Sequence, residues 1–517
     1  MRSAKLIGLA LQWLGAVWLG AQTAALTPRT ISLDECLEMA LKNNFDLRIE
    51  RYNIEEFRLQ LKESQTFYDP VFSFQSGRAS LSKLSHRDKP FPENGLEVAE
   101  DYRIGDYLEY GLEGLGPMGF SYRVPVEFSR QFRPEKNWTE TDWFGGGGTI
   151  LHPYKEYRGS LGVEMSQPLL KGFLIDDLRR LVLVNRKYLK MSEFVYETLL
   201  MDVVTAVRLN YYELLFAREQ VKVMEKALEL SEKLLADNRA KVRAGVLPPL
   251  DEKQAESQVA VSKADLLRAQ QQVLLRENAL KNLIVKDLPE WKTVSVIPSE
   301  ALLAVPQVLD VQESWRTGLV RRPDLAELRT DLERRDIEVK YRKNQTLPEL
   351  NLVGSYKRDA LGTGFEDVFW DSHDPSSRYG YYGVGVELKF PWGNRAAKYR
   401  LQRERESRAQ AELRVQQLQQ NIMVQIDDAI SNAKISFDRI EATRQAREYA
   451  EAALQAEQKK LENGKSTSFF VLQFQRDLTE ARSQEIRALT DYNNAMANLA
   501  RAEGTAIERV KLKLQYK

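Results

Sequence analysis

The sequence predicts a mainly α-helical protein built from two long antiparallel helical hairpins, with a smaller β part. Glycine and proline are absent from four runs: Phe173–Ala244, Leu250–Leu288, Asn394–Asn463 and Lys465–Glu503. Such runs indicate helices, because these two residues are the usual helix breakers. Each long run is followed by a glycine and a run about half as long, which indicates a reversal. At about 1.5 Å per residue, each long helix would reach roughly 100 Å.

An internal repeat supports this architecture. Three pairs of landmark residues occur in both halves: Asp46 with Asp324, Pro70 with Pro348, and Gly245 with Gly464. The first two pairs share an offset of 278 residues. Each half is therefore expected to contain a helical start, a β region, a long helix, a glycine turn and a shorter helix.

The expected boundaries follow from these landmarks. Residues 1–25 are expected to be a secretory signal peptide, with Arg2 and Lys5 before an apolar core and small residues at its end. The first repeat covers 26–306, with a β region at 70–168, helices at 173–244 and 250–288, and a proline-rich linker at 289–306. The second covers 307–517, with a β region at 348–391, helices at 394–463 and 465–503, and a short tail.

The first long helix carries a heptad ladder. Its members are Leu200, Val207, Leu214, Val221, Leu228, Leu235 and Val242. A similar ladder follows on the returning helix, with Val259, Leu266, Val273 and Leu280. A seven-residue repeat predicts left-handed packing against other helices.

The segments next to the prolines alternate between apolar and polar residues, which predicts half-buried strands. The apolar positions are Phe72 and Phe74; Leu161, Val163 and Met165; Leu350, Leu352 and Tyr356; and Val384, Val386, Leu388 and Phe390. About four strands per chain are expected, and Tyr107–Gln131 has the pattern of an additional hairpin around Gly116 and Pro117. In an exported protein this pattern also fits transmembrane strands. Four strands are too few to close a barrel, so several chains must share one.

Composition excludes several functions. Lys and Arg number 75 against 74 Asp and Glu, so no basic excess favours nucleic acid. The single cysteine, Cys36, lies in an amphipathic pattern and is expected to be buried rather than lipidated. Neither a catalytic constellation nor a metal or cofactor site is predicted; His86, His152 and His373 all fall between the strands. We therefore expect a protein that is not an enzyme.

These features together resemble the TolC-like outer-membrane efflux family over nearly all of residues 31–504. The resemblance rests on Ser32–Glu35, Ala40–Leu47, Ser166–Leu170 and the paired Gly245 and Gly464. It implies a homotrimer in the outer membrane, in which each chain gives about four strands to a shared β-barrel and two hairpins to an α-barrel tunnel across the periplasm. It implies a passive exit duct of a tripartite efflux or type I secretion system.

The resemblance also implies partners, namely a periplasmic adaptor (membrane fusion) protein and an inner-membrane pump. The expected docking surface is the hairpin tip, made of Val242, Gly245, Val246, Leu247, Asp251, Gly464 and Lys465. Family members often carry acidic residues just after the second tip glycine, whereas here no acid precedes Asp477. Asp251, six residues after Gly245, fits the family pattern.

Two other interpretations remain open at this point. One is a soluble periplasmic coiled-coil scaffold, in which the small sheets act as spacers. The other is a surface enzyme that processes glycosides or peptides, which the absence of a predicted site disfavours.

Overall fold

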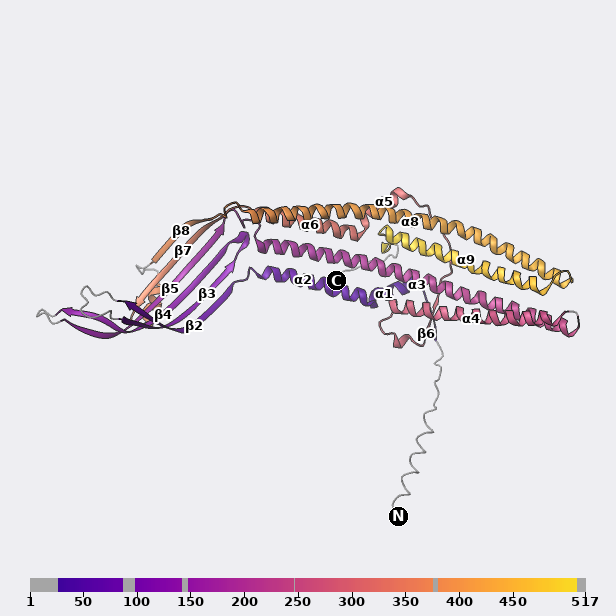
Figure 1. Cartoon of the computed structure of the whole chain (residues 1–517), viewed down its shortest axis with the longest axis horizontal. Coiled ribbons are helices and arrows are strands. Elements are labelled where there is room, and N and C mark those ends of the chain that lie inside the picture. The colour runs from indigo at the N-terminus through magenta and orange to yellow at the C-terminus, as the bar shows by residue number, and fades with distance from the viewer. Residues whose placement is uncertain (1–26, 87–97, 142–146, 246, 375–379, 509–517) are drawn as a thin grey trace, which may run out of the picture. The chain divides into compact units, whose positions relative to one another are not determined.

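The computed structural model describes residues 27–86, 98–141, 147–245, 247–374 and 380–508 (Figure 1). The expected signal peptide and Val246 lie outside these residues. The chain divides into two compact units: one holds Met1–Tyr52, Phe194–Leu325 and Gln417–Lys517, and the other holds Asn53–Glu193 and Ala326–Gln416. Each unit is described by itself.

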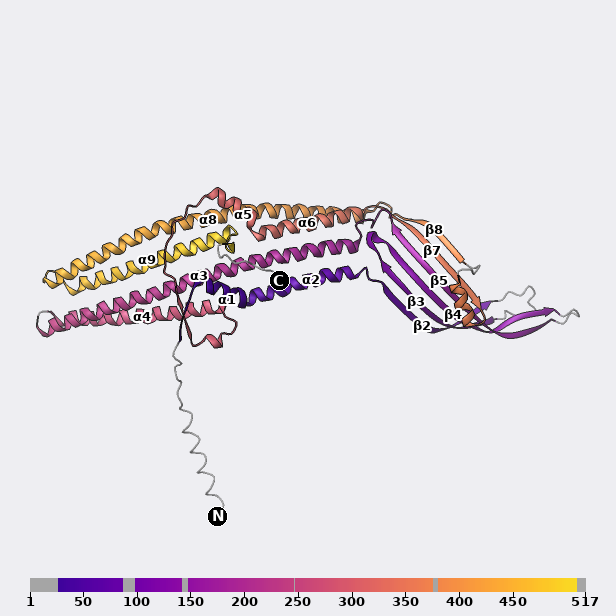
Figure 2. The ribbon, with the colours of Figure 1, turned by 180° about the vertical axis from the view of Figure 1, so that it is seen from behind.

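The four long helices form two hairpins. In the first, α3 (Asp177–Arg243) is followed by α4 (Pro249–Ile284); in the second, α8 (Arg395–Glu462) is followed by α9 (Ser468–Ala502). Figures 1 and 2 both show α4 beside α3 and α9 beside α8. The first helix begins later than the expected Phe173, because Gly172 and Leu174 have φ angles of 84° and 64° that no α-helix contains. The returning α4 ends before the expected Leu288 because Val285 is already extended.

The shorter helices match between the two halves. α1 (Leu33–Asn43) and α5 (Val311–Arg321) each have 11 residues, and α2 (Phe45–Thr66) and α6 (Pro323–Asn344) each have 22. Side chains cap both leading helices: Ser32 accepts a hydrogen bond from the Glu35 amide, and Asp310 accepts one from the Gln312 amide.

A small parallel sheet closes the first half. β1 (Thr27–Ile31) pairs with β6 (Val294–Pro298) inside the expected linker, after a short 3₁₀ helix at Pro289–Trp291. A buried ion pair between Glu277 and Lys281 holds β6 in place, with an Nζ–Oε1 distance of 2.9 Å.

The backbone of β6 and of the preceding 3₁₀ helix supplies further partners to both charged groups. The Val296 amide donates to Glu277 at 3.0 Å, and Lys281 donates to the Trp291 carbonyl at 2.9 Å. Arg218 donates to the Val296 carbonyl at 2.6 Å, and burial lowers the pKa of this guanidinium.

The large sheet has six antiparallel strands within the described residues, not the four expected. Their order is β2 (Val71–His86), β3 (Val98–Leu115), β4 (Ser121–Thr141), β5 (Gly147–Pro168), β7 (Glu349–Gly362) and β8 (Gly380–Lys389). The extra pair is the hairpin indicated at Tyr107–Gln131, with its turn in the 3₁₀ segment Pro117–Gly119. An added hairpin preserves antiparallel order, so it is accommodated without changing the neighbouring strands.

A helix that the sequence did not predict, α7 (Phe365–His373), packs on one face of this sheet. Val368 is buried against Val126, Phe128 and Ala360. The α7 helix approaches closely because a Cβ on Gly159 would lie 2.7 Å from the Val368 side chain. His373 belongs to this helix rather than to a loop, and its Nδ1 lies 2.7 Å from the Phe369 carbonyl.

The heptad ladder of α3 is a packing surface. Leu200, Val207, Leu214 and Leu235 are buried, and Val221, Leu228 and Val242 are partly buried. The returning ladder on α4 is buried only at Leu280; its other members are partly buried. Cys36 is fully buried in α1, as expected, and burial raises the pKa of its thiol to about 12.

Candidate functional site: the two hairpin tips and the two-faced sheet

The first hairpin tip turns at Gly245. This glycine has a φ of 71°, and its amide donates to the Val242 carbonyl at 3.0 Å. Nothing lies within 4 Å of where its Cβ would be, so the left-handed backbone, rather than crowding, requires glycine here. The following helix starts at Pro249. Proline is suited to this position because amide groups in the first turn of a helix have no partner within the helix.

Ion pairs tie the two arms of the first tip together. Arg239 on α3 contacts Glu252 at 3.1 Å and Glu256 at 2.7 Å on α4. Within α4, Lys253 also contacts Glu256 at 2.8 Å. Hydrogen bonds from Lys253 and Arg239 hold the pKa of the Glu256 carboxyl below its ordinary value. The fully buried Asn238 also bridges the arms by donating to the Asp251 carbonyl at 3.3 Å.

The second tip also turns on a left-handed glycine, with different side chains around it. Gly464 has a φ of 69° and donates to the Leu461 carbonyl at 3.1 Å, while the Lys465 amide donates to the Lys460 carbonyl at 2.8 Å. These two bonds define a Schellman motif, which satisfies the last carbonyls of α8. As at the first tip, the space around the glycine is open.

One carboxylate organises the second tip. Glu457 on α8 accepts hydrogen bonds from Ser466 and from Lys460, the latter at 2.9 Å. These two groups, Ser466 first, hold the pKa of Glu457 below its ordinary value of 4.5. An acid thus lies before the glycine, and none follows it until Asp477.

Two aromatic side chains project beside the second glycine turn. Phe469 and Phe470 are 56% and 49% exposed, with ring centroids 5.7 Å apart. At the first tip the exposed apolar residue is Leu250 at 67%. None of these three was among the predicted site residues, although two consecutive phenylalanines close to the turn glycine were a visible signal.

The predicted tip residues are found in different environments. Gly245, Gly464 and Lys465 are exposed. Val242, Leu247 and Asp251 are partly buried, and Val246 lies outside the described residues. The structure brings the two tips together near their ends, because Ser468 at the start of α9 donates to Asn238 on α3 at 3.2 Å.

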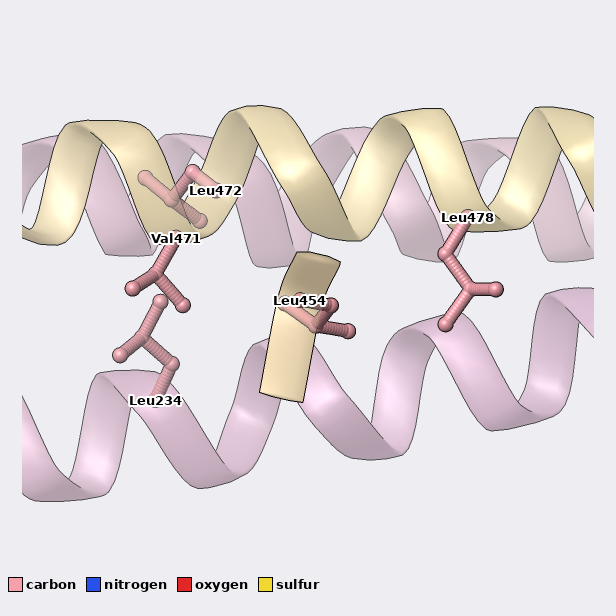
Figure 3. Packing of buried hydrophobic residues seen from close by; sticks show 5 residues of the cluster. All are labelled: Leu234, Leu454, Val471, Leu472 and Leu478. Atoms are coloured by element: carbon pink, nitrogen blue, oxygen red, sulfur yellow. The ribbon is translucent and has the colours of Figure 1, made fainter. Parts of the chain in front are cut away.

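An apolar cluster near this hydrogen bond packs the two hairpins against each other. It contains Leu234 of α3, Leu454 of α8, and Val471, Leu472 and Leu478 of α9, all buried. Figure 3 shows Val471 directed toward Leu234, with Leu454 and Leu478 farther along the same seam. The residues that follow the exposed phenylalanines therefore face inward, as the helical period requires.

Polar contacts continue this seam along α3 and α9. They join Asp202 to Arg501 at 2.6 Å, Glu213 to Arg487 at 3.1 Å, and Gln220 to Ser483 at 2.8 Å. One contact joins the returning helices, from Arg476 of α9 to Gln258 of α4 at 2.8 Å. The two hairpins are thus held together by polar contacts as well as by the apolar cluster.

The large sheet has one apolar and one polar face. The register places Phe72, Leu112, Val124, Val163, Tyr356 and Tyr382 on one face, together with the alternating apolar positions that the sequence indicated, except Phe390, which lies beyond the end of β8. The opposite face carries Glu113, Arg123, Glu164 and Ser355, and is hollowed by a depression of about 790 Å³. A concave polar face opposite an apolar face is the arrangement of a wall that separates water from lipid.

The described helices include none with a stretch apolar and long enough to span a bilayer. Within the same described residues, no group of three or more His, Cys, Asp or Glu side chains could hold a metal ion.

Comparisons with known proteins identify this architecture. The family model described as outer membrane efflux protein matches residues 152–284 and 316–505, more than half of the chain. The chain belongs to the outer membrane efflux protein family. No curated protein matches the sequence significantly.

Solved structures share the fold at low sequence identity. The outer-membrane channel OprN is 16% identical, with a TM-score of 0.65 over 92% of this chain and 90% of that one. The CmeC outer membrane channel of Campylobacter jejuni is 15% identical, with a TM-score of 0.63 over 94% and 90%. The open state of the MtrE outer membrane channel of Neisseria gonorrhoeae is 16% identical, with a TM-score of 0.63 over 92% and 89%.

This efflux protein is therefore an outer-membrane exit duct. The family is one of channels, whose members generally work with an adaptor and an inner-membrane pump.

Proposed function

We propose that three copies of this efflux protein assemble into one duct, with a β-barrel in the outer membrane and a helical tunnel in the periplasm. The observation that carries the proposal is the pair of open edges on a two-faced sheet. In the described residues, β2 pairs only with β3, and β8 pairs only with β7. Unpaired backbone groups at an edge cost several kcal/mol each in lipid, so β8 of one copy is expected to pair with β2 of the next.

Exposed apolar residues on the helices support the same assembly. On α4 these are Val261, Leu267, Leu274 and Leu275, between 46% and 59% exposed. On α8, Val424 and Ile435 are 58% and 66% exposed. Apolar side chains repeated along a helix are expected to be covered by neighbouring helices, here those of adjacent copies.

The assembly is tested by its mass in detergent and by its need for detergent. The expected result is a trimer that aggregates when detergent is removed. A folded monomer in bilayers would contradict the shared barrel. A protein that stays monodisperse in plain buffer would instead support the soluble periplasmic scaffold.

The tips are the proposed docking surface for a periplasmic adaptor of a tripartite efflux or type I secretion system, which an inner-membrane pump would energise. The surface comprises Val242, Gly245, Val246, Leu247, Asp251, Gly464 and Lys465, to which we add Leu250, Phe469 and Phe470. Exposed aromatic residues at a backbone turn offer large contact area with little loss of side-chain entropy, which favours protein recognition.

The docking role is tested by comparing two substitutions at Gly464. Gly464→Trp and Gly464→Asn both place a side chain on a left-handed residue, but asparagine tolerates that backbone and is small. Tryptophan is expected to lower adaptor crosslinking and export at least tenfold without changing the trimer yield, and asparagine to leave both near the wild-type level. Equal crosslinking in both variants would leave Gly464 as a helix cap without a docking role.

A further inference from the structure

The hairpin formed by β3 and β4 is paired to its neighbours like any other part of the sheet. β2 and β3 are in register from Val71 with Glu113 to His86 with Val98. β3 and β4 pair from Leu115 with Ser121 to Ile104 with Phe132. β4 is paired with β5 on its other side, so β2 and β5 are not neighbours.

Both faces of the sheet continue through this hairpin. Tyr110 of β3 lies opposite Phe74 of β2 and Val126 of β4, and Val126 lies opposite Leu161 of β5. On the polar face, Glu109 lies opposite Glu127. Glu127 accepts hydrogen bonds from Ser160 at 3.2 Å and from Lys357 of β7 at 3.4 Å. An accessory hairpin folded away from the wall would have no reason to match the alternation on either side.

The turn of the hairpin is fixed to the end of β5. Gln167 donates to the Met118 carbonyl at 3.1 Å. Gly119 has a φ of 77°, and a Cβ there would lie 2.8 Å from Pro168 and 2.9 Å from the Gly172 carbonyl. The turn therefore sits beside the point where β5 leaves the sheet, in line with the other strand ends.

We propose that β3 and β4 are part of the membrane wall, so that the assembled barrel contains eighteen strands rather than the twelve that four strands per chain would give. This inference rests on the trimeric duct proposed above. Because barrel diameter grows roughly linearly with strand number, the barrel would be about one and a half times as wide as a twelve-stranded one. Barrels of this size hold an aqueous channel without needing side chains to fill them.

Alternation of solvent and lipid contact along the hairpin tests the proposal. The buried Cys36 is the only cysteine, so nitroxide labels can be placed at single introduced cysteines without altering it. Leu112→Cys and Val124→Cys are predicted to contact lipid and to collide with oxygen. Glu109→Cys and Glu127→Cys are predicted to contact water and to collide with a soluble nickel chelate. Val386→Cys and Glu387→Cys on β8 are the matched pair outside the hairpin.

The outcomes separate this inference from the proposed function. Alternation at the hairpin equal to that of the β8 pair supports eighteen strands. Nickel access at all four hairpin positions, with alternation retained on β8, overturns the inference and leaves a twelve-stranded duct. Loss of alternation on β8 as well would overturn the shared barrel itself. Averaged images of the wild-type detergent trimer along its axis provide an independent strand count, and twelve strands would overturn the inference.

Discussion

The two hairpin tips share a glycine turn and differ in the side chains around it. Both turn on a glycine with a φ near 70° that has open space around it, 71° at Gly245 and 69° at Gly464. The first tip is closed by ion pairs from Arg239 of α3 to two carboxylates on α4. The second depends on Glu457 with Ser466 and Lys460, and exposes two phenylalanines.

The two halves of the repeat therefore share the backbone features of the hairpin but not the side chains at its tip. Helix length and the cap are backbone properties, which a glycine at the right place determines. The chemistry presented at the tip depends on side chains that have diverged between the halves. We expect the first hairpin to be the fixed arm and the second to be the arm that loosens more easily.

The largest effect is expected from a substitution that disrupts the packing of the first hairpin. Leu214→Asp places an unpaired charge at a fully buried ladder position, which is expected to cost on the order of 3–5 kcal/mol. The yield of folded trimer and the thermal midpoint should both fall. Ala236→Asp, at an exposed position of the same helix, is the control. A wild-type midpoint for Leu214→Asp would show that the ladder is not a packing surface.

The next largest effect is expected from a substitution that should loosen the second tip more than the first. Leu478→Ala removes a buried member of the cluster in Figure 3 and should cost about 2–5 kcal/mol locally. Proteolysis at Lys465 should accelerate while cleavage near Arg243 changes little. The exposed Phe470→Ala should leave proteolysis unchanged and reduce adaptor crosslinking instead. Equal acceleration at both tips would mean that the hairpins loosen together.

The smallest effect is a dependence on pH. The pKa of Glu457 is lowered in the folded tip, so its contribution to stability is present above its ordinary value of 4.5 and is lost as the pH falls through the lower folded value. Hydrogen exchange at Ser466–Ser468 should therefore accelerate only in acid. Glu457→Gln should give faster exchange at neutral pH and remove the acid dependence. The same acid dependence in the variant would assign the titration to another group.

The parts that sequence predicted well are those with long, regular signals. The hairpins required only the absence of glycine and proline over many turns, and the strand faces required only alternation between residues such as Val384 and Glu387. The expected count of about four strands was too low, and the two additional strands are those of the hairpin that Tyr107–Gln131 had indicated. The helix α7 was missed because nine residues provide too few turns for a periodic signal. Phe469 and Phe470 were overlooked because exposure depends on which side of α9 faces Leu234, and that is a tertiary property.

The pairing of β1 with β6 has a consequence for the order of folding. Thr27, the first residue described, pairs with Val294, so the small sheet needs two segments separated by more than half the chain. Contacts of such separation form late, because the loop-closure entropy must be overcome first. The beginning of the described chain therefore has no strand partner until β6 has been made and brought back to it. Until then β1 presents open strand edges.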